Sequence, residues 1–175
     1  MKVMFYGGRQ SGMIVLLSIL AKKIEVCYVI PEDDIVRTVA DQFNIKIIEK
    51  GQVNDKIVAD IVKKDKIDLF VCCHGKRIIK DNILGSCECI NVHPCLYKYK
   101  GAEPISRLIK DDNTKASVAV HKMTDKVDDG DVMIELFKDV ELDSVVSVYN
   151  QLYPLYSKVI VDVLRLVGEG VRDGK

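Results

Sequence analysis

The sequence has no excess of charge of either sign and no apolar run long enough to cross a bilayer. It contains 26 basic and 26 acidic side chains, so the molecule as a whole has no long-range attraction for nucleic acid or for an anionic membrane. The longest apolar stretch, residues 13–21, is interrupted by Ser18 and is far shorter than the roughly 20 residues of a transmembrane helix. We therefore expect no nucleic-acid or membrane partner, and we expect local groups to bind any anionic substrate.

The chain also lacks the marks of a secreted or metal-binding protein. Its first residues read as a strand, and no small-residue cleavage site follows them. Four of the six cysteines form two close pairs, Cys72 with Cys73 and Cys87 with Cys89, inside apolar segments and without CxxC spacing. We expect a cytoplasmic protein with reduced, buried thiols and no metal. A metal site built from these thiols and His74 is the less favoured alternative.

Short apolar runs alternate with helical patterns along the chain. Strand patterns fall at residues 2–6, 24–30, 45–48, 68–73, 87–92, 115–123 and 132–140. Helical patterns fall at about residues 10–22, 33–43, 54–64, 81–84, 104–110 and 144–167. The alternation predicts an α/β fold, with an open, mostly parallel sheet, helices on both faces and a C-terminal helical segment over about residues 142–168. Without a repeat or a linker, residues 1–175 are predicted to form a single domain.

Single residues predict how some helices begin and end. Gln10 or Ser11 is expected to cap the first helix, and Asp33 or its neighbour the second. Pro154 is expected to kink the last helix or to divide it in two, because proline lacks the N–H that a helix interior needs. The glycines of Gly168–Gly170 are expected to stop it.

The most informative stretch lies at the end of the predicted fifth strand. Asn91 and His93 are two residues apart, so their side chains project from the same face of the strand. Ligands of open α/β sheets bind at strand ends, and an amide beside an imidazole can stabilise an oxyanion. A structural histidine is the alternative. The loop that follows contains Tyr97 and Tyr99 and is expected to form an aromatic wall of a pocket.

A second stretch is an acidic loop after the sixth strand. It contains Asp125, Asp128, Asp129 and Asp131, and Gly130 permits a turn among them. Composition alone favours a solvated turn with capping aspartates. Nothing in the spacing itself connects this loop with Asn91.

A family resemblance connects the two stretches. Asn91 to Pro94, the following Tyr99 to Gly101 and the later run His121 to Gly130 resemble the folate-dependent formyltransferases. This family includes glycinamide ribonucleotide transformylase, the catalytic domain of methionyl-tRNA formyltransferase and the sugar N-formyltransferases. The resemblance covers residues 1 to about 140 and implies a Rossmann-like domain. It departs from the family pattern at Cys95, where serine is usual, and at Tyr97-Lys98, where Leu-Pro is usual.

The resemblance implies that Asn91, His93 and Asp128 are the catalytic residues of an enzyme. The reaction would transfer a formyl group from 10-formyltetrahydrofolate to a primary amine, without a metal. Asn91, and His93 when protonated, would donate to the oxyanion. Asp128 would handle the proton that the amine loses and the folate nitrogen gains. Covalent catalysis by Cys95 is not expected.

The resemblance also implies where the two substrates bind. The folate would lie against two loops, at His74, Gly75, Lys76, Arg77, Ile78, Ile79, Met123, Thr124, Asp125 and Val127. The acceptor would lie against the first strand-to-helix turn and the aromatic loop, at Gly8, Arg9, Gln10, Ser11, Tyr97, Tyr99 and Lys100. Because a helix N-terminus offers N–H groups to an anion, the first turn is expected to face a phosphorylated part of the acceptor. A plain helix cap is the alternative.

The identity of the acceptor is inferred from a short sequence segment. Gly101 to Pro104, with Arg107, resembles the sugar and tRNA branch of the family, and the balanced charge offers no surface for tRNA. A nucleotide-linked amino sugar is therefore the expected acceptor. Glycinamide ribonucleotide is the second choice and hydrolysis of the formyl-folate the third. A homodimer stays open.

Two readings from other classes remain. Gly7, Gly8 and Gly12 after the first strand, with Glu32 or Asp33 after the second, suggest a dinucleotide-dependent oxidoreductase. Their spacing is Gly-Gly-x-x-x-Gly, which does not match Gly-x-Gly-x-x-Gly. A catalytically silent folate- or nucleotide-binding domain is the other reading, because a fold does not fix a function.

Overall fold

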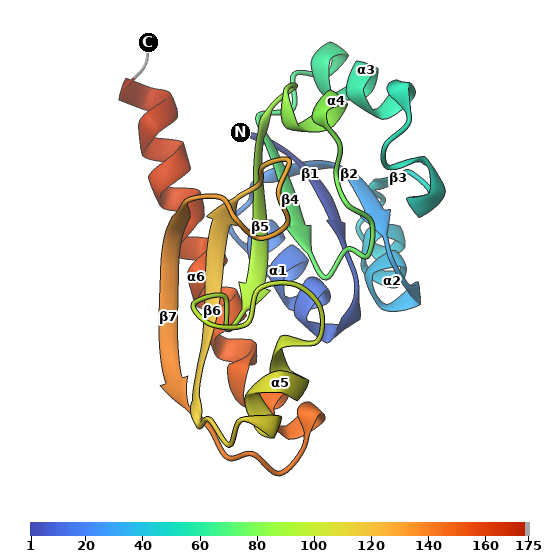
Figure 1. Cartoon of the computed structure of the whole chain (residues 1–175). Helices are drawn as coiled ribbons and strands as arrows, with labels where there is room; N and C mark the ends of the chain where they lie inside the picture. The colour runs from blue at the N-terminus through green and yellow to red at the C-terminus, as the bar shows by residue number, and fades with distance from the viewer. Residues whose placement is uncertain (174–175) are drawn as a thin grey trace.

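A seven-stranded sheet forms the centre of the computed structural model, which describes residues 1–173 and the side chains of residues 1–168 (Figure 1). The sheet order is β3-β2-β1-β4-β5-β6-β7. The strands are β1 (Lys2–Gly7), β2 (Glu25–Pro31), β3 (Lys46–Ile47), β4 (Leu69–Cys73), β5 (Glu88–Pro94), β6 (Lys115–Lys122) and β7 (Val132–Asp139). Pairs among β1 to β5 are parallel, whereas β6 pairs antiparallel with β5 and β7. The predicted open, mostly parallel α/β sheet is confirmed.

Helices cover both faces of this sheet. They are α1 (Arg9–Ala21), α2 (Asp34–Gln42), α3 (Lys56–Lys64), α4 (Asp81–Leu84), α5 (Pro104–Lys110) and α6 (Val145–Asp173), with a short 3-10 turn at Lys50–Gln52. Val3 and Phe5 of β1 face one core cluster with residues of α1, α2, α5 and α6. Met4 and Tyr6 face the opposite cluster with α3 and α4. Strand alternation thus directs successive β1 side chains into two separate cores.

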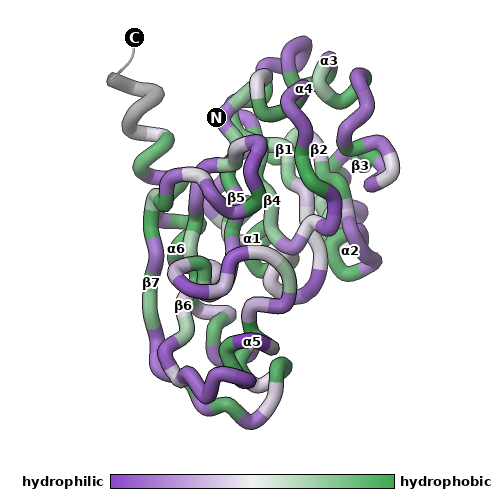
Figure 2. Tube along the Cα trace, viewed as in Figure 1, coloured by the Kyte–Doolittle hydropathy of each residue, from purple (hydrophilic) through white to green (hydrophobic). Residues whose placement is uncertain are grey.

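The central strands are covered on both sides, as parallel strands of such a sheet must be. Every residue of β4 is buried. Figure 2 shows hydrophobic residues along central strands such as β4 and hydrophilic ones along the loops at the periphery. Polar side chains can therefore gather only where the strands end.

The first helix is not capped as predicted. It begins at Arg9, so Gln10 and Ser11 lie inside it, and the N-cap residue Gly8 has no side chain to cap it. Asp33, which is 24 residues away in the sequence, caps α1 instead, because its Oδ2 accepts a hydrogen bond from the Arg9 backbone N–H. The same carboxylate also caps α2, as predicted, by accepting from Val36 N at 3.2 Å.

The last helix is longer than predicted. It runs as one helix from Val145 to Asp173, with Pro154 in its interior, so the prediction of two helices is wrong, as is the stop at Gly168–Gly170. Its inward side chains are buried in the core beside α1. This packing outweighs the one backbone hydrogen bond that proline removes and the low helix propensity of glycine. Within residues 1–173, no helix is both long and apolar enough to span a bilayer.

Candidate active site

A cavity of about 380 Å³ opens at the carboxyl ends of β4 and β5, where α/β sheets bind their ligands. Four segments supply most of its lining: residues 74–79 after β4, residues 91–94 of β5, residues 101–104 before α5, and the turn that contains residues 123–128. Arg9 of α1, Cys72 of β4, His121 of β6 and Tyr149 of α6 complete it. The two stretches singled out in the sequence therefore meet at one cavity.

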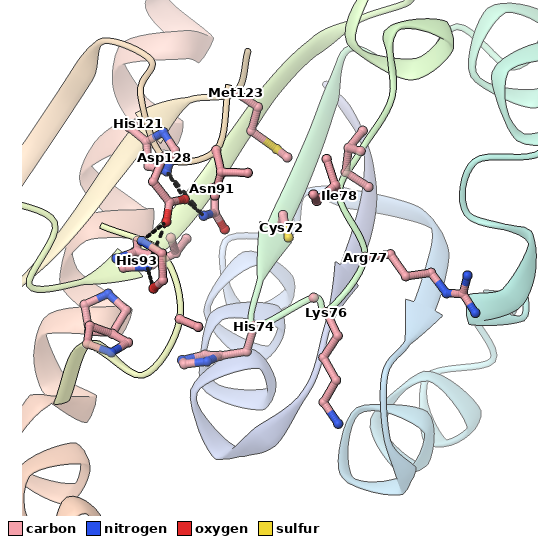
Figure 3. Close-up of a pocket in the computed structure, with 18 of the residues that line it drawn as sticks. Cys72, His74, Lys76, Arg77, Ile78, Asn91, His93, His121, Met123 and Asp128 are labelled. Carbon is pink, nitrogen blue, oxygen red and sulfur yellow. Dashed lines mark hydrogen bonds and ion pairs between the residues drawn. The ribbon is translucent and has the colours of Figure 1, made fainter. Parts of the chain in front are cut away.

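Asn91, His93 and Asp128 form a hydrogen-bonded cluster in this cavity, as Figure 3 shows. Asp128 Oδ1 lies 3.3 Å from Asn91 Nδ2, and Asp128 Oδ2 lies 3.1 Å from His93 Nε2. The side chains come from β5 and from the turn between β6 and β7, 37 residues further along the chain. The structure thus brings together the three residues that the resemblance implied.

His121 belongs to the same cluster and was not among the predicted site residues. It lies opposite Asn91 in the antiparallel pairing of β5 with β6 and is 2% exposed. Its Nδ1 is 2.8 Å from the Lys122 carbonyl oxygen and therefore carries a hydrogen. Its Nε2 is 3.2 Å from Asn91 Nδ2 and 3.5 Å from Asp128 Oδ1. Neutral His121 accepts from Asn91, and protonated His121 pairs with Asp128.

Asp128 is the centre of the cluster. Its Oδ2 also accepts a hydrogen bond of 2.7 Å from the Gly101 backbone N–H, so both carboxylate oxygens are engaged. Burial opposes ionisation, but the hydrogen bonds with His121 and His93 outweigh it and hold the pKa of Asp128 well below its usual value. Asp128 is therefore a carboxylate at every pH at which the protein would work.

A glycine fixes the turn that carries Asp128. A Cβ atom on Gly130 would lie 1.9 Å from the Lys122 carbonyl oxygen. That carbonyl belongs to the end of β6, beside His121, and cannot move without disturbing the strand. The spacing of Asp128 and Gly130 therefore has a packing cause, because only glycine lets the turn close on the strand.

His93 has one anchored nitrogen and one without a partner. Its Nε2 lies 3.1 Å from Asp128 Oδ2 and 3.2 Å from the Gly101 carbonyl oxygen. Both partners are acceptors, so Nε2 carries a hydrogen. Its Nδ1 is buried and has no hydrogen-bond partner in the described part of the chain. A buried polar atom without a partner on a cavity residue is a place where a substrate atom would be stabilised.

Most residues of the expected folate site line the cavity. All six residues from His74 to Ile79 do so, as do Met123, Thr124 and Val127. Asp125 is exposed and lies outside it, next to a shallower depression. In Figure 3, Cys72, Ile78 and Met123 lie beside Asn91, whereas the side chains of Lys76 and Arg77 extend away from Asp128. The loop therefore presents mainly backbone and apolar groups to the cluster around Asp128.

Few residues of the expected acceptor site reach the cavity. Arg9 lines it, whereas Gly8, Gln10 and Ser11 do not, and Ser11 is only 1% exposed. The carboxylate of Asp33 already occupies the Arg9 backbone N–H. Of the first turn, only the side chain of Arg9 therefore faces the cavity. The N-terminus of α1 is already hydrogen-bonded to the carboxylate of Asp33.

The expected aromatic wall lies outside the cavity. Lys100 is paired with Asp129 at 2.7 Å. Tyr99 is buried and donates to Asp111 at 3.0 Å, and Tyr97 packs on Phe137 of β7, with the ring centroids 5.3 Å apart. The chain turns at Cys95, which has a positive φ of 54°, and this turn directs both tyrosines away.

An aromatic residue of α6, Tyr149, lines the cavity instead, and no pattern in the sequence indicated it. The His74 ring lies edge-on to Tyr149, 5.6 Å between centroids, and its Nε2 is 3.1 Å from the Tyr156 hydroxyl. Burial, followed by the charge of Arg9, lowers the pKa of His74 to about 3. His74 is therefore neutral at physiological pH, and Arg9 is the cation on this side of the cavity.

The thiols near the cavity are not suited to nucleophilic chemistry. Cys95 is fully buried in the core, and burial raises its pKa to about 11. Cys72 lines the cavity, and burial raises its pKa to about 12. Thiolates are the reactive form of cysteine. In the described part of the chain, no group of three histidine, cysteine or acidic residues is arranged to hold a metal ion.

The cavity is also where unusual backbone conformations gather. Among the residues that the structure describes, nine that are not glycine have positive φ angles. Four of them, Lys23, Asn44, Lys66 and Asp112, directly follow the C-caps of helices, where a left-handed residue is ordinary. The other five are Arg9, His74, Cys95, Glu103 and Asp128, and all but Cys95 line the cavity. Strained residues of this kind concentrate at functional sites.

Relatives of known sequence match most of the chain. The chain is 30% identical over 148 residues to a methionyl-tRNA formyltransferase of Protochlamydia amoebophila, covering 76% of this chain and 46% of the relative. It is 28% identical over 180 residues to a methionyl-tRNA formyltransferase of Mesoplasma florum, covering 93% of this chain and 57% of the relative. The chain thus spans about half the length of these relatives.

Solved structures share the fold. Glycinamide ribonucleotide transformylase 1 from Symbiobacterium toebii superposes with a TM-score of 0.85 at 18% identity, over 97% of this chain and 88% of that one. A formyltetrahydrofolate deformylase from Pseudomonas putida superposes with a TM-score of 0.76 at 14% identity, over 98% of this chain and 65% of that one. The family model described as formyl transferase matches residues 7–164. With Asn91, His93 and Asp128 gathered in its cavity, the chain belongs to the formyl transferase family.

Proposed function

We propose that this protein transfers the formyl group of 10-formyltetrahydrofolate to a primary amine. The observation that carries the proposal is the cluster of Asn91, His93, His121 and Asp128 in the cavity at the end of β5. In this reaction the amine nitrogen bonds to the formyl carbon, the bond from that carbon to the folate nitrogen breaks, and one proton passes from the amine to the departing nitrogen. The site has a group for each of these requirements.

The proton is assigned to His93. Asp128 is held as a carboxylate with both oxygens engaged, so it is a poor carrier of a proton at neutral pH. It fixes the hydrogen on Nε2 of His93, which leaves the unpartnered Nδ1 to accept the proton of the amine and return it to the folate nitrogen. This changes the role expected for Asp128 from proton carrier to the group that orients His93.

Stabilisation of the oxyanion is assigned to Asn91. Its Nδ2 bears two hydrogens, one near Asp128 Oδ1 and one near His121 Nε2. The ionised Asp128 keeps the first, and the second, which neutral His121 accepts at 3.2 Å, turns to the formyl oxygen as negative charge develops on it. One preorganised donor of this kind contributes roughly 3 kcal/mol to the transition state.

Arg9 and Tyr149 support an acceptor that carries both a ring and a negative charge. The Tyr149 ring and the Arg9 guanidinium line this side of the cavity, and the Tyr149 ring lies beside His74 of the loop that we propose for the folate. Asp33 at the N-terminus of α1 would repel a phosphate placed on the backbone there. A nucleotide-linked amino sugar, with its charge near the Arg9 side chain, is the acceptor we propose, ahead of glycinamide ribonucleotide.

The test is a measurement of tetrahydrofolate release from 10-formyltetrahydrofolate with a panel of acceptors. The panel contains amino-sugar nucleotides, glycinamide ribonucleotide, methionyl-tRNA and water alone, because two relatives bear the name of methionyl-tRNA formyltransferases. We expect release that depends on an amino-sugar nucleotide. Release with water alone would identify a hydrolase, and no release with any acceptor, together with no folate binding, would refute the proposal.

Arg9 tests the acceptor side separately. Arg9→Ala removes the cation of that wall while leaving the backbone bond to Asp33 in place. We expect the acceptor KM to rise about 10-fold, as for the loss of one charged contact, with the KM for the folate unchanged. Steady-state kinetics with each substrate varied in turn measure this, and an unchanged acceptor KM would remove Arg9 from the acceptor site.

A further inference from the structure

The backbone of the loop at residues 74–79 is attached from behind to two side chains that do not touch the cavity. The Arg77 N–H donates to the hydroxyl of Tyr6 at 2.9 Å, and the Lys76 N–H donates to Glu32 Oε2 at 3.3 Å. The Tyr6 hydroxyl donates to the same Glu32 oxygen at 2.7 Å. Two successive loop amides are thus bound to one tyrosine–carboxylate pair that originates in β1 and at the end of β2.

The pair is buried and fixed. Tyr6 is fully buried and Glu32 is 8% exposed. Lys50 lies 3.5 Å from Glu32 Oε1 and donates to the Glu32 carbonyl oxygen at 2.8 Å, and the Glu32 N–H donates to the Gly7 carbonyl oxygen at 2.7 Å. A buried carboxylate is stable only when paired and hydrogen-bonded, and this one satisfies that requirement through the loop.

These contacts already engage both carboxylate oxygens of Glu32. The sequence permitted Glu32 as the group that binds a ribose in a dinucleotide enzyme. In the structure Oε2 accepts from Tyr6 and Lys76, and Oε1 faces Lys50. Glu32 is absent from the cavity lining, whereas the loop residues that it holds are part of it.

The loop also packs directly on the ring of Tyr6. A Cβ atom on Gly75 would lie 2.2 Å from Tyr6 Cε1, so the loop backbone rests on the ring itself. His74, immediately before it, has the positive φ of 58° that turns the chain onto this surface. The position of the loop is therefore determined by Tyr6 through packing and through hydrogen bonds at once.

We infer that Tyr6 and Glu32 are positioning residues that hold the 74–79 loop in the conformation that binds the formyl donor. The inference rests on the proposed function, in which this loop lines the folate site. The pair acts on the affinity for the folate and leaves the chemical step to Asn91, His93 and Asp128. Loss of the pair therefore raises the KM for 10-formyltetrahydrofolate without lowering kcat.

The chain contains a matched control for this pair. Tyr28 of β2 donates its hydroxyl to Asp65, at the C-cap of α3, and neither residue lines the cavity. Tyr28→Phe therefore removes a tyrosine–carboxylate bond from the same sheet without touching the loop. It separates a general loss of packing from an effect on the loop.

The experiment compares Tyr6→Phe, Glu32→Ala and Glu32→Gln with Tyr28→Phe in the full chain. For Tyr6→Phe and Glu32→Ala we expect the KM for 10-formyltetrahydrofolate to rise about 5- to 10-fold, the loss of one or two hydrogen bonds, with kcat within about twofold. Glu32→Gln keeps one oxygen acceptor for Tyr6 or Lys76, so its effect should be smaller than that of Glu32→Ala. Tyr28→Phe should leave both constants unchanged.

Amide hydrogen exchange measures the stability of the loop conformation independently of enzyme activity. The amides of Lys76 and Arg77 should exchange faster in Tyr6→Phe and Glu32→Ala than in the parent, and at the parent rate in Tyr28→Phe. Faster exchange in a protein that binds no folate would refute the proposed function and leave the positioning role intact. Unchanged exchange with an unchanged KM, or an equal loss in Tyr28→Phe, would overturn the inference.

Discussion

The two walls of the cavity are built in opposite ways. The wall formed by β5, β6 and the turn after β6 offers charged and polar side chains, joined by hydrogen bonds around Asp128. The wall formed by residues 74–79 carries the side chains of Lys76 and Arg77 away from Asp128 and is bound through its amides to Tyr6 and Glu32. In the proposed function one wall supplies the reacting groups, and the other supplies a shaped surface that is held from outside the site.

This difference between the walls predicts which property of the enzyme a substitution in each wall should change. In the first wall the chemical groups hold one another, so a substitution there should alter the rate of reaction. In the second wall the holding groups are remote from the substrate, so a substitution there should alter affinity and stability. Comparable substitutions in the two walls can test this distinction.

The largest effect is expected from Asp128→Asn. The amide keeps the shape of the side chain and loses the charge that orients His93. We expect kcat to fall by roughly 10²- to 10⁴-fold, the usual contribution of a general acid–base assembly, with folate binding largely retained. Single-turnover kinetics and calorimetric titration of a folate analogue check this. A healthy Asp128→Asn enzyme would remove the carboxylate from the mechanism.

Gly75→Ala should have the next largest effect, and on the other wall. A Cβ atom at this position would meet the ring of Tyr6 at 2.2 Å, so the loop must move. We expect a loss of about 1–3 kcal/mol in the free energy of unfolding, the usual cost of overpacking, together with weaker folate binding. Gly51→Ala is the control, because nothing lies within 4 Å of its Cβ position. Equal urea midpoints for the two variants would contradict the close packing of Gly75 on the Tyr6 ring.

Acidification should lower the contribution of Asp128, in the first wall, to the stability of the folded protein. The pKa of Asp128 is lowered in the folded protein, so its ionised form contributes stability above its unfolded pKa of about 3.9. That contribution is lost as the pH falls below about 4 toward the lower folded pKa. The urea midpoint of the parent should therefore fall relative to that of Asp128→Asn between pH 6 and pH 3. A constant difference over this range would show that Asp128 is not charge-stabilised.

The smallest effect is expected from Asp129→Asn, one residue away from the largest. Asp129 is exposed, and its partner Lys100 is exposed as well. Surface pairs of this kind contribute little, so kcat and both KM values should stay within about twofold of the parent. If Asp129→Asn were the inactive enzyme, the catalytic carboxylate would lie one residue further along the chain than we place it.

The sequence predicted the order of strands and helices because each element carries a local signal. Apolar runs such as Leu69–Cys73 and caps such as Asp33 are local, and the structure confirms them. The division of the last helix at Pro154 and its stop at Gly168 were predicted wrongly, because the packing of α6 on α1 and β6 is a tertiary effect that overrides local propensity.

The site was only partly readable for the same reason. Asn91, His93 and Asp128 were found through a motif, whereas His121 owes its place to the register of β6 against β5, which no spacing reveals. Tyr97 and Tyr99 looked like pocket residues until the turn at Cys95 directed them away.

Four cavity residues, Arg9, His74, Glu103 and Asp128, hold left-handed backbone angles without being glycine. Each such angle costs about 1 kcal/mol or more, and glycine would relieve it. At Arg9 and Glu103, whose side chains are exposed, selection for heat resistance alone would therefore drift toward glycine, whereas the hydrogen bonds of His74 and Asp128 offset that gain. Such a lineage would gain melting temperature while it lost two side chains that line the cavity, so stability and turnover oppose each other at these two codons.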